Sequence, residues 1–163
     1  MENQEQFRDL KFEVAYSYCY EKIMYKFFGR LDKLASFILL LTGMSVVATA
    51  WSGLALGSIV AIVTSLQLIY TPGQRSQAAK DACRAYLSLY QSLNTMTAEQ
   101  IRESLLSLNK LDTDEIGCLS HPARLAALNM VGWVPPEFSP ERKMTKLENF
   151  ASHFAGEKPE YPF

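Results

Sequence analysis

A stretch without any charged residue is the strongest constraint in this sequence. Residues 34–74 contain no Asp, Glu, Lys, Arg or His, although both flanks are rich in charge. The stretch holds two apolar runs, Leu34–Ala50 and Leu54–Tyr70, and each would extend ~26 Å as a helix, close to the ~30 Å hydrocarbon core of a bilayer. Because ionised groups are costly in hydrocarbon, the pattern predicts an all-α integral membrane protein with a two-helix transmembrane hairpin.

Two soluble structures are alternatives to this prediction. A soluble all-helical protein could bury the hairpin in its core, and the many β-branched residues leave buried strands as a second alternative. Ala48-Thr49-Ala50 resembles a signal-peptidase site, but a long segment precedes the first run and a second apolar run follows it. We therefore expect no cleavage there.

The ends of the two runs carry residues suited to a membrane surface. Trp51 lies in the short connection between the runs and Tyr70 ends the second run, and both side chains suit the headgroup level. Gly53 permits a tight reversal of the chain. Lys33 and Arg75 flank the hairpin and can extend toward the headgroups.

Basic residues occur on both flanks of the hairpin and are absent from its turn. They are Lys22, Lys26, Arg30 and Lys33 before the first run, and Arg75, Lys80 and Arg84 after the second. Because basic flanks stay on the cytoplasmic side, both termini are expected to be cytoplasmic and the turn to lie outside.

Small and hydroxyl side chains recur at helical spacing in both runs. The helix-packing set consists of Gly53, Gly57, Ala61 and Ser65 in the second run. The candidate pore-lining set consists of Thr42, Ser45 and Thr49 in the first run, on a stripe that Ser52 continues, and of Gln67 in the second run. One interpretation is that these faces only hold helices together, because small residues allow close packing in lipid. The other is that several hairpins associate and the polar set lines a water-filled path, which requires a homo-oligomer.

The flanking segments divide the chain into four parts. Residues 1–33 are expected to form a cytoplasmic helix, residues 34–71 the hairpin and residues 72–134 a cytoplasmic helical region. Residues 135–163 are expected to form an extended, proline-rich tail, either disordered or a partner-binding strap. One apolar stripe runs along Phe12, Tyr16, Cys19, Ile23 and Phe27, and a second along Ala78, Ala82, Ala85 and Leu89. These stripes predict antiparallel pairing of the two helices below the membrane. Gly29, Pro72 and Gly73 are candidate hinges.

Local signals place two further helices after the paired segment. Thr97 with Gln100 predicts a capping box. Ser120 is a candidate cap for a last helix over 122–131, ended by Gly132. The acidic residues 112–115 lack calcium-loop spacing, so we expect a solvated loop there.

No motif indicates catalysis, a metal or a cofactor. The two histidines, His121 and His153, fit no metal spacing or base–nucleophile pattern, and His121 is expected to be a capping or surface residue. Cys19, Cys83 and Cys118 are far apart and indicate free thiols in a reducing compartment. A net charge of -1 gives no reason to expect a nucleic-acid partner.

The order of these elements resembles the SLATT group of bacterial two-transmembrane proteins. The likeness is carried by the hairpin Leu34–Tyr70, by RSQAAKDACRAYLSLYQSL over 75–93 and by the helical stretch ending near Trp133. It implies an effector of anti-phage defence that oligomerises and permeabilises the inner membrane. It also implies a separate cytoplasmic sensor protein or second-messenger enzyme as partner, because this chain carries no sensing module of its own.

The sequence therefore predicts an oligomeric pore-forming or membrane-perturbing effector in contact with membrane lipid. A non-conducting membrane adaptor that presents its cytoplasmic helices to a partner protein is the alternative from a different class. A phage holin is a third option, for which the sizeable cytoplasmic region would be unusual.

Overall fold

The computed structural model describes residues 2–45, 53–132 and 143–157, and their regular structure is helical throughout. The elements in chain order are α1 (Glu2–Ser45), α2 (Gly53–Tyr70), α3 (Pro72–Ser92), η1 (Leu93–Thr95), α4 (Ala98–Leu108), η2 (Asn109–Leu111), α5 (Gly117–Val131) and α6 (Lys146–Ala155). The all-α prediction is confirmed. The described parts of both apolar runs are helical, so buried strands are excluded for them.

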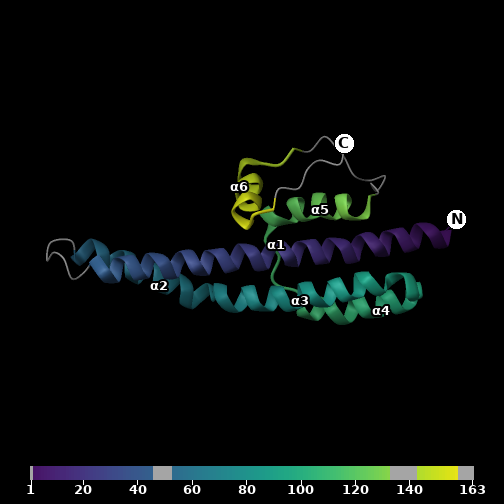
Figure 1. Cartoon of the computed structure of the whole chain (residues 1–163), viewed down its shortest axis with the longest axis horizontal. Coiled ribbons are helices and arrows are strands. Elements are labelled where there is room, and N and C mark those ends of the chain that lie inside the picture. The colour runs from purple at the N-terminus through teal and green to yellow at the C-terminus, as the bar shows by residue number, and fades with distance from the viewer. Residues whose placement is uncertain (1, 46–52, 133–142, 158–163) are drawn as a thin grey trace.

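The long helix α1 is the axis of the molecule. Figure 1 shows α2 beside the C-terminal half of α1 and α3 beside its N-terminal half, with α4 next to α3. The helices α5 and α6 lie on the opposite side of α1. We refer to the N-terminal part of α1, residues 2–33, together with α3 to α6 as the helical bundle. The part of α1 beyond Lys33, together with α2, is the hairpin.

The predicted antiparallel pairing of α1 with α3 is confirmed, and the residues at its centre differ in part from the predicted stripes. The buried residues of α3 are Pro72, Ala79, Ala82, Cys83, Tyr86 and Leu89. Ala78 is exposed and Ala85 is half-buried, because the buried face begins one residue later than predicted. On α1 the buried set includes Val14, Ala15, Cys19, Ile23 and Met24. It is wider than one stripe because helices cover α1 on two sides.

Gly29 lies inside α1, which continues through it without a break. A Cβ at this position would lie 3.0 Å from Ser76 Oγ, the hydroxyl that donates a hydrogen bond of 2.9 Å to the Tyr25 carbonyl. Gly29 is therefore a point of close approach between α1 and α3. The structure gives no separate support to its prediction as a hinge.

The chain does break between α2 and α3. Thr71 has φ 40° and ψ 54°, the left-handed region, and Pro72 begins the next helix. A proline disfavours the right-handed helical conformation in the residue before it, which explains why α2 does not continue through Thr71. The break lies where Pro72 and Gly73 predicted a change of direction.

Caps define α4 and α5. The predicted capping box is present, because Thr97 Oγ1 accepts from the Gln100 amide and the Gln100 side chain accepts from Thr97 N. Helix α5 ends at Val131 with Gly132 in the left-handed conformation, as predicted. Its start is corrected, because α5 begins at Gly117 and contains Ser120 and Pro122.

The C-terminal tail is not extended throughout. Residues 146–155 form α6, which has its own capping box between Thr145 and Glu148 and ends at Gly156 with φ 74°. Ala151 and Ala155 of α6 belong to the same apolar core as Ile23 and Met24 of α1. The prediction of an extended tail is therefore wrong for this segment, since the prolines around it obscured a short amphipathic helix.

The contact at Gly29 leads to a test of helix packing. Gly29→Leu should lower the temperature of thermal unfolding, because the added side chain forces Ser76 from its hydrogen bond and separates α1 from α3. Overpacking of this kind costs ~1–3 kcal/mol. Gly43→Leu is the matched control in the same helix, because a Cβ at Gly43 meets no atom within 4 Å. Equal unfolding temperatures of the two variants would contradict the assignment.

Candidate functional site: an exposed apolar hairpin on a polar-pocketed bundle

The hairpin carries its large apolar side chains on the outside. Leu40 is 62% exposed, Leu68 is 78% exposed and Ile69 is 71% exposed. Other exposed members are Leu34, Phe37, Leu41, Ile59, Ile62, Leu66 and Tyr70. Full burial of such a side chain contributes ~1.5–3 kcal/mol, and in water the hairpin forgoes part of this at each position. A soluble protein would bury them, and within the described residues this chain does not.

One helical stretch of the described residues, Ala55–Thr95, is long and apolar enough to cross a membrane by length and composition. Its apolar part is α2, because α3 carries charged residues. Little of that apolar part is buried inside the chain. This exposure disfavours the alternative of a soluble protein that buries the hairpin in its own core.

The helix-packing set lies on the outer surface of α2. Gly53 begins the helix, and Gly57, Ala61 and Ser65 are all exposed. A Cβ at Gly57 would meet no atom within 4 Å. These residues therefore do not hold α1 against α2 within one chain. The half-buried side of α2 lies instead at Leu56, Val60, Val63 and Gln67.

Of the candidate pore-lining set, Thr42 and Gln67 are the residues whose exposure the structure describes, and neither is exposed. Thr42 is buried, and its hydroxyl donates to the carbonyls of Ile38 and Leu39 in its own helix, at 2.9 and 3.0 Å. Ser45 is the last residue of α1, and Thr49 lies outside the described residues. Gln67 is half-buried between α1 and α2. The hydroxyl of Thr42 is thus satisfied inside one hairpin.

The four interface anchors have different surroundings. Trp51 lies outside the described residues, whereas Tyr70 and Lys33 are exposed at the two sides of the hairpin base. Arg75 is half-buried, pairs with Asp114 at 3.2 Å and lies over the Phe28 ring at 5.8 Å from its centroid. Arg75 therefore joins α3 to the neighbouring loop and to α1.

An apolar cavity of about 370 Å³ lies between α1 and α2 at the base of the hairpin. Leu31, Leu34 and Ile38 line it from α1, and Val63 and Leu66 line it from α2. Tyr70 and Pro72, beside the break at Thr71, close its lower end. The two helices are thus loosely packed at the level where the charge-free run begins.

A loop crosses α1 within the bundle and connects its two sides. Residues 112–116 pass from η2 to α5 on the other side of α1, as Figure 1 shows. Glu21 accepts hydrogen bonds from Thr113 N at 3.1 Å and from Thr113 Oγ1 at 3.2 Å. Tyr20 Oη accepts from Ile116 N at 2.6 Å. The predicted solvated loop is confirmed for the acidic side chains of Asp112, Asp114 and Glu115, which are exposed. The loop backbone is not free, because α1 supplies partners for Thr113 and Ile116.

Glu21 is a buried carboxylate that the sequence analysis did not identify. Its side chain is 1% exposed, beside a cavity of about 160 Å³ that Asp112 and Glu115 also line. Burial raises the pKa of Glu21 from 4.5 to about 7; hydrogen bonds from Thr113 oppose that rise, and the charge of Asp112 adds to it. The only sequence signal was an acidic residue on an otherwise apolar face of α1.

Tyr86 completes the polar network on the α3 side. This residue is fully buried, and its hydroxyl donates to Asp112 Oδ1 at 2.7 Å and lies 3.1 Å from Asn109 Oδ1. Burial first, and the bond to Asp112 second, raise the pKa of Tyr86. Tyr86 therefore attaches the end of η2 to the α1–α3 pair.

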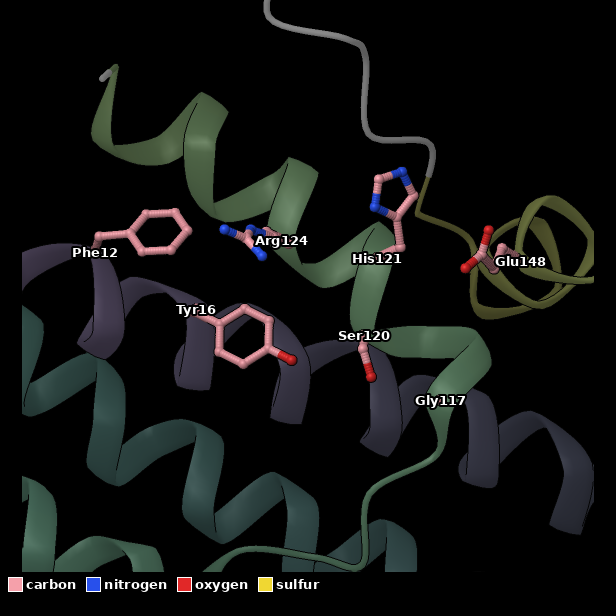
Figure 2. A pocket seen from close by; sticks show the side chains of 7 residues that line it. All are labelled: Phe12, Tyr16, Gly117, Ser120, His121, Arg124 and Glu148. Atoms are coloured by element: carbon pink, nitrogen blue, oxygen red, sulfur yellow. The ribbon is translucent and has the colours of Figure 1, made fainter. Parts of the chain in front are cut away.

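A groove of about 430 Å³ opens between α1, α5 and α6 (Figure 2). Phe12 and Tyr16 line it from α1, Gly117, Ser120, His121 and Arg124 from α5, and Glu148 from α6. His121 is buried, which corrects its expected role as a capping or surface residue. The Glu148 carboxylate accepts from Thr145 N at 2.7 Å, so it is committed to the cap of α6. The groove therefore combines aromatic and charged side chains.

Cys19, Cys83 and Cys118 are free thiols, as predicted. Burial raises the pKa of Cys19 to about 12 and that of Cys83 to about 11, so both remain protonated at neutral pH. No group of three or more His, Cys, Asp or Glu side chains within the described residues is arranged to hold a metal ion.

Comparison with protein-family models, with curated proteins and with solved structures gives no match.

The raised pKa of Glu21 leads to a prediction about pH and stability. The folded chain holds the proton more tightly than the unfolded chain, so ionisation of Glu21 opposes folding. This penalty is absent below about pH 4.5 and complete above about pH 7. Glu21→Gln should therefore raise the thermal unfolding temperature at pH 8 and remove this part of the pH dependence. The amide oxygen can still accept from Thr113.

Glu13→Gln is the matched control, because Glu13 is an exposed carboxylate on the same helix. It should leave the unfolding temperature at pH 8 nearly unchanged. An unfolding temperature of Glu21→Gln at or below that of the unaltered chain at pH 8 would contradict the prediction.

Proposed function

We propose that this protein inserts its hairpin, residues 34–71, across a bilayer and acts there as an oligomeric membrane-perturbing effector. The observation that carries the proposal is the exposed apolar surface of α1 and α2 in a region without charged residues. Each central Leu, Ile, Phe or Val contributes roughly -0.3 to -0.6 kcal/mol to insertion. Lipid would provide the apolar environment that the rest of the chain does not.

The same proposal gives both ends of the hairpin a cytoplasmic location at the bacterial inner membrane. Lys33 and Lys80 are exposed basic residues on the two flanks, and the turn carries none. Other flanking cations are engaged within the chain, since Lys22 and Lys26 pair with Glu157. Basic residues near a span favour the cytoplasmic side whether or not they later form ion pairs.

Cysteine labelling tests this topology. In a chain whose three native cysteines are replaced by Ala, Ser52→Cys should react with a membrane-impermeant maleimide in intact cells. Gln77→Cys, at an exposed position of α3, should react only after lysis. The reverse pattern would overturn the orientation, and reaction at both positions in intact cells would overturn double spanning.

The helix-packing set supports assembly between subunits. Gly57, Ala61 and Ser65 are exposed on a side of α2 that α1 does not cover. Small residues at every fourth position let two helices approach closely in lipid, where packing and not hydrophobicity drives association. We therefore assign this set to contacts between hairpins, as an alternative to contacts within one hairpin.

The continuity of α1 supports coupling between the bundle and the membrane. One helix runs from the bundle through Leu34 to Ser45, so a displacement of the bundle is transmitted along an uninterrupted backbone. Because Thr42 is bonded within its own helix, a conducting path would have to use other polar groups of the charge-free region. The resemblance to SLATT proteins suggests the same kind of activity.

A non-conducting adaptor is the second candidate function. Leu106 on α4 and Leu111 at the end of η2 are exposed on the bundle, away from the hairpin. Such side chains suit contact with another protein. An adaptor would depend on them and would leave the membrane barrier intact.

Induced expression with a membrane-potential dye tests the effector against the adaptor. The unaltered chain should dissipate the potential, and Ala61→Leu and Gly57→Leu should both restore it and shift the detergent-solubilised protein to smaller oligomers. Ala55→Leu is the matched control, because it adds the same side chain at an exposed position ~120° around α2 from Ala61. A full potential with abundant membrane-inserted protein would contradict the effector and favour the adaptor.

A further inference from the structure

Helix α6 places its large apolar side chains outside and its small ones inside. Leu147 is 63% exposed and Phe150 is 66% exposed, whereas Ala151 and Ala155 are buried against the bundle. At 100° per residue, Leu147, Phe150 and Phe154 share one side of the helix. The described chain therefore leaves the Leu147 and Phe150 side of α6 largely uncovered.

The position of α6 along α1 is fixed by three contacts. The rings of Phe154 and Phe27 meet edge to face with centroids 5.3 Å apart, and Arg30 Nη1 donates to the Phe154 carbonyl at 2.7 Å. Glu157, just after α6, pairs with Lys22 and Lys26. The charge-free run begins seven residues after Phe27, or ~10 Å along the helix axis. Helix α6 thus lies on the bundle side of the start of the hairpin; Figure 1 shows it against the middle of α1, on the side opposite to α3.

An apolar surface connects α6 with the hairpin. Phe150 stacks on Phe154 with centroids 6.2 Å apart, and Phe154 contacts Phe27. On α1, Leu31 and Leu34 follow Phe27 at spacings of four and three, which places them on the same face. Leu31 is half-buried and Leu34 is 45% exposed. Leu31 and Leu34 also line the cavity between α1 and α2, so this face of α1 connects Phe27, beside α6, with the start of the hairpin assigned to lipid.

The charge beside this surface is basic. Lys143 and Lys146 are exposed at the start of α6, and Arg30 and Lys33 are exposed on the adjoining part of α1. Of the described acidic residues here, Glu148 is buried in the cap of α6, Glu157 is engaged by Lys22 and Lys26, and Asp32 is half-buried on α1. The exposed charges are therefore basic. Basic residues beside an apolar helix face match the anionic headgroups of a cytoplasmic leaflet.

We propose that α6 is an interfacial helix, which inserts Leu147 and Phe150 at the headgroup–acyl boundary of the membrane that the hairpin spans. The lysines at its start contact anionic headgroups. The proposal rests on the proposed insertion of the hairpin. Its depth requires the hydrocarbon core to begin near Leu31, with Lys33 extending to the headgroups. Phe27 then lies ~6 Å below the core, within the ~5–7 Å that a headgroup region adds. The bilayer would then hold α6 against the base of α1.

Tryptophan quenching tests this location in the full chain. Trp51 and Trp133 are replaced by Phe, and one new tryptophan is introduced as Phe150→Trp, as Ile62→Trp in the hairpin, or as Leu106→Trp on α4. Each protein is reconstituted in vesicles of phosphatidylcholine and phosphatidylglycerol, with or without brominated acyl chains. Leu106 is the matched exposed position, 62% exposed and located at the far end of the bundle.

The expected result is a loss of emission in brominated vesicles for the tryptophans at positions 150 and 62, and none at position 106.

Replacing both Lys143 and Lys146 by Gln should reduce the loss of emission at position 150; an unchanged loss would overturn headgroup recognition by these lysines. Quenching at position 62 without quenching at position 150 would overturn the interfacial helix and leave hairpin insertion intact. No quenching at position 62 would overturn both proposals. Equal quenching at positions 106 and 150 would show unspecific adsorption of the bundle and also overturn the assignment.

Discussion

The unbroken helical backbone of α1 is the constraint on which the rest of this structure depends. A helix satisfies its own hydrogen bonds in any surroundings, so α1 can continue from a charged region into a charge-free one without a loop between them. What changes along α1 is the set of helices that covers it. As far as Lys33, α3, α5 and α6 surround it, and beyond Lys33 only α2 accompanies it among the described residues. The bundle therefore has a protein core, whereas the apolar side chains of the hairpin remain on the surface.

The crossing of the loop 112–116 over α1 is the second organising feature, and polar chemistry makes it feasible. A loop pressed against a helix would leave backbone N–H groups without water, and each one left unsatisfied costs ~1–3 kcal/mol. Tyr20 and Glu21 accept from those groups, and Tyr86 holds the beginning of the loop from the other side. The desolvated charge of Glu21 is the cost of this arrangement. It explains why a carboxylate occurs on the most enclosed part of α1.

The sequence was sufficient to predict what depends on local pattern. The two charge-free helices, the pairing of α1 with α3, the capping box at Thr97 and the end of α5 at Gly132 all follow from spacing and composition, and the structure contains each of them. It was insufficient where a residue's role depends on distant partners. In the sequence Glu21 has the features of an ordinary solvated acid, because its hydrogen-bond partner Thr113 is 92 residues away along the chain. Helix α6 was missed because prolines lie on both sides of a segment that is only ten residues long, and its buried face uses alanines.

The two connections between the hairpin and the bundle differ in continuity. One, α1, is a single helix, and the other contains the left-handed residue Thr71 next to an apolar void at the base of the hairpin. A change of angle between the hairpin and the bundle is easier at a break between two helices than within one continuous helix. Motion of the bundle would therefore swing α2 about α1 and leave the course of α1 unchanged. The outer face of α2, with Gly57 and Ala61, would undergo the largest displacement.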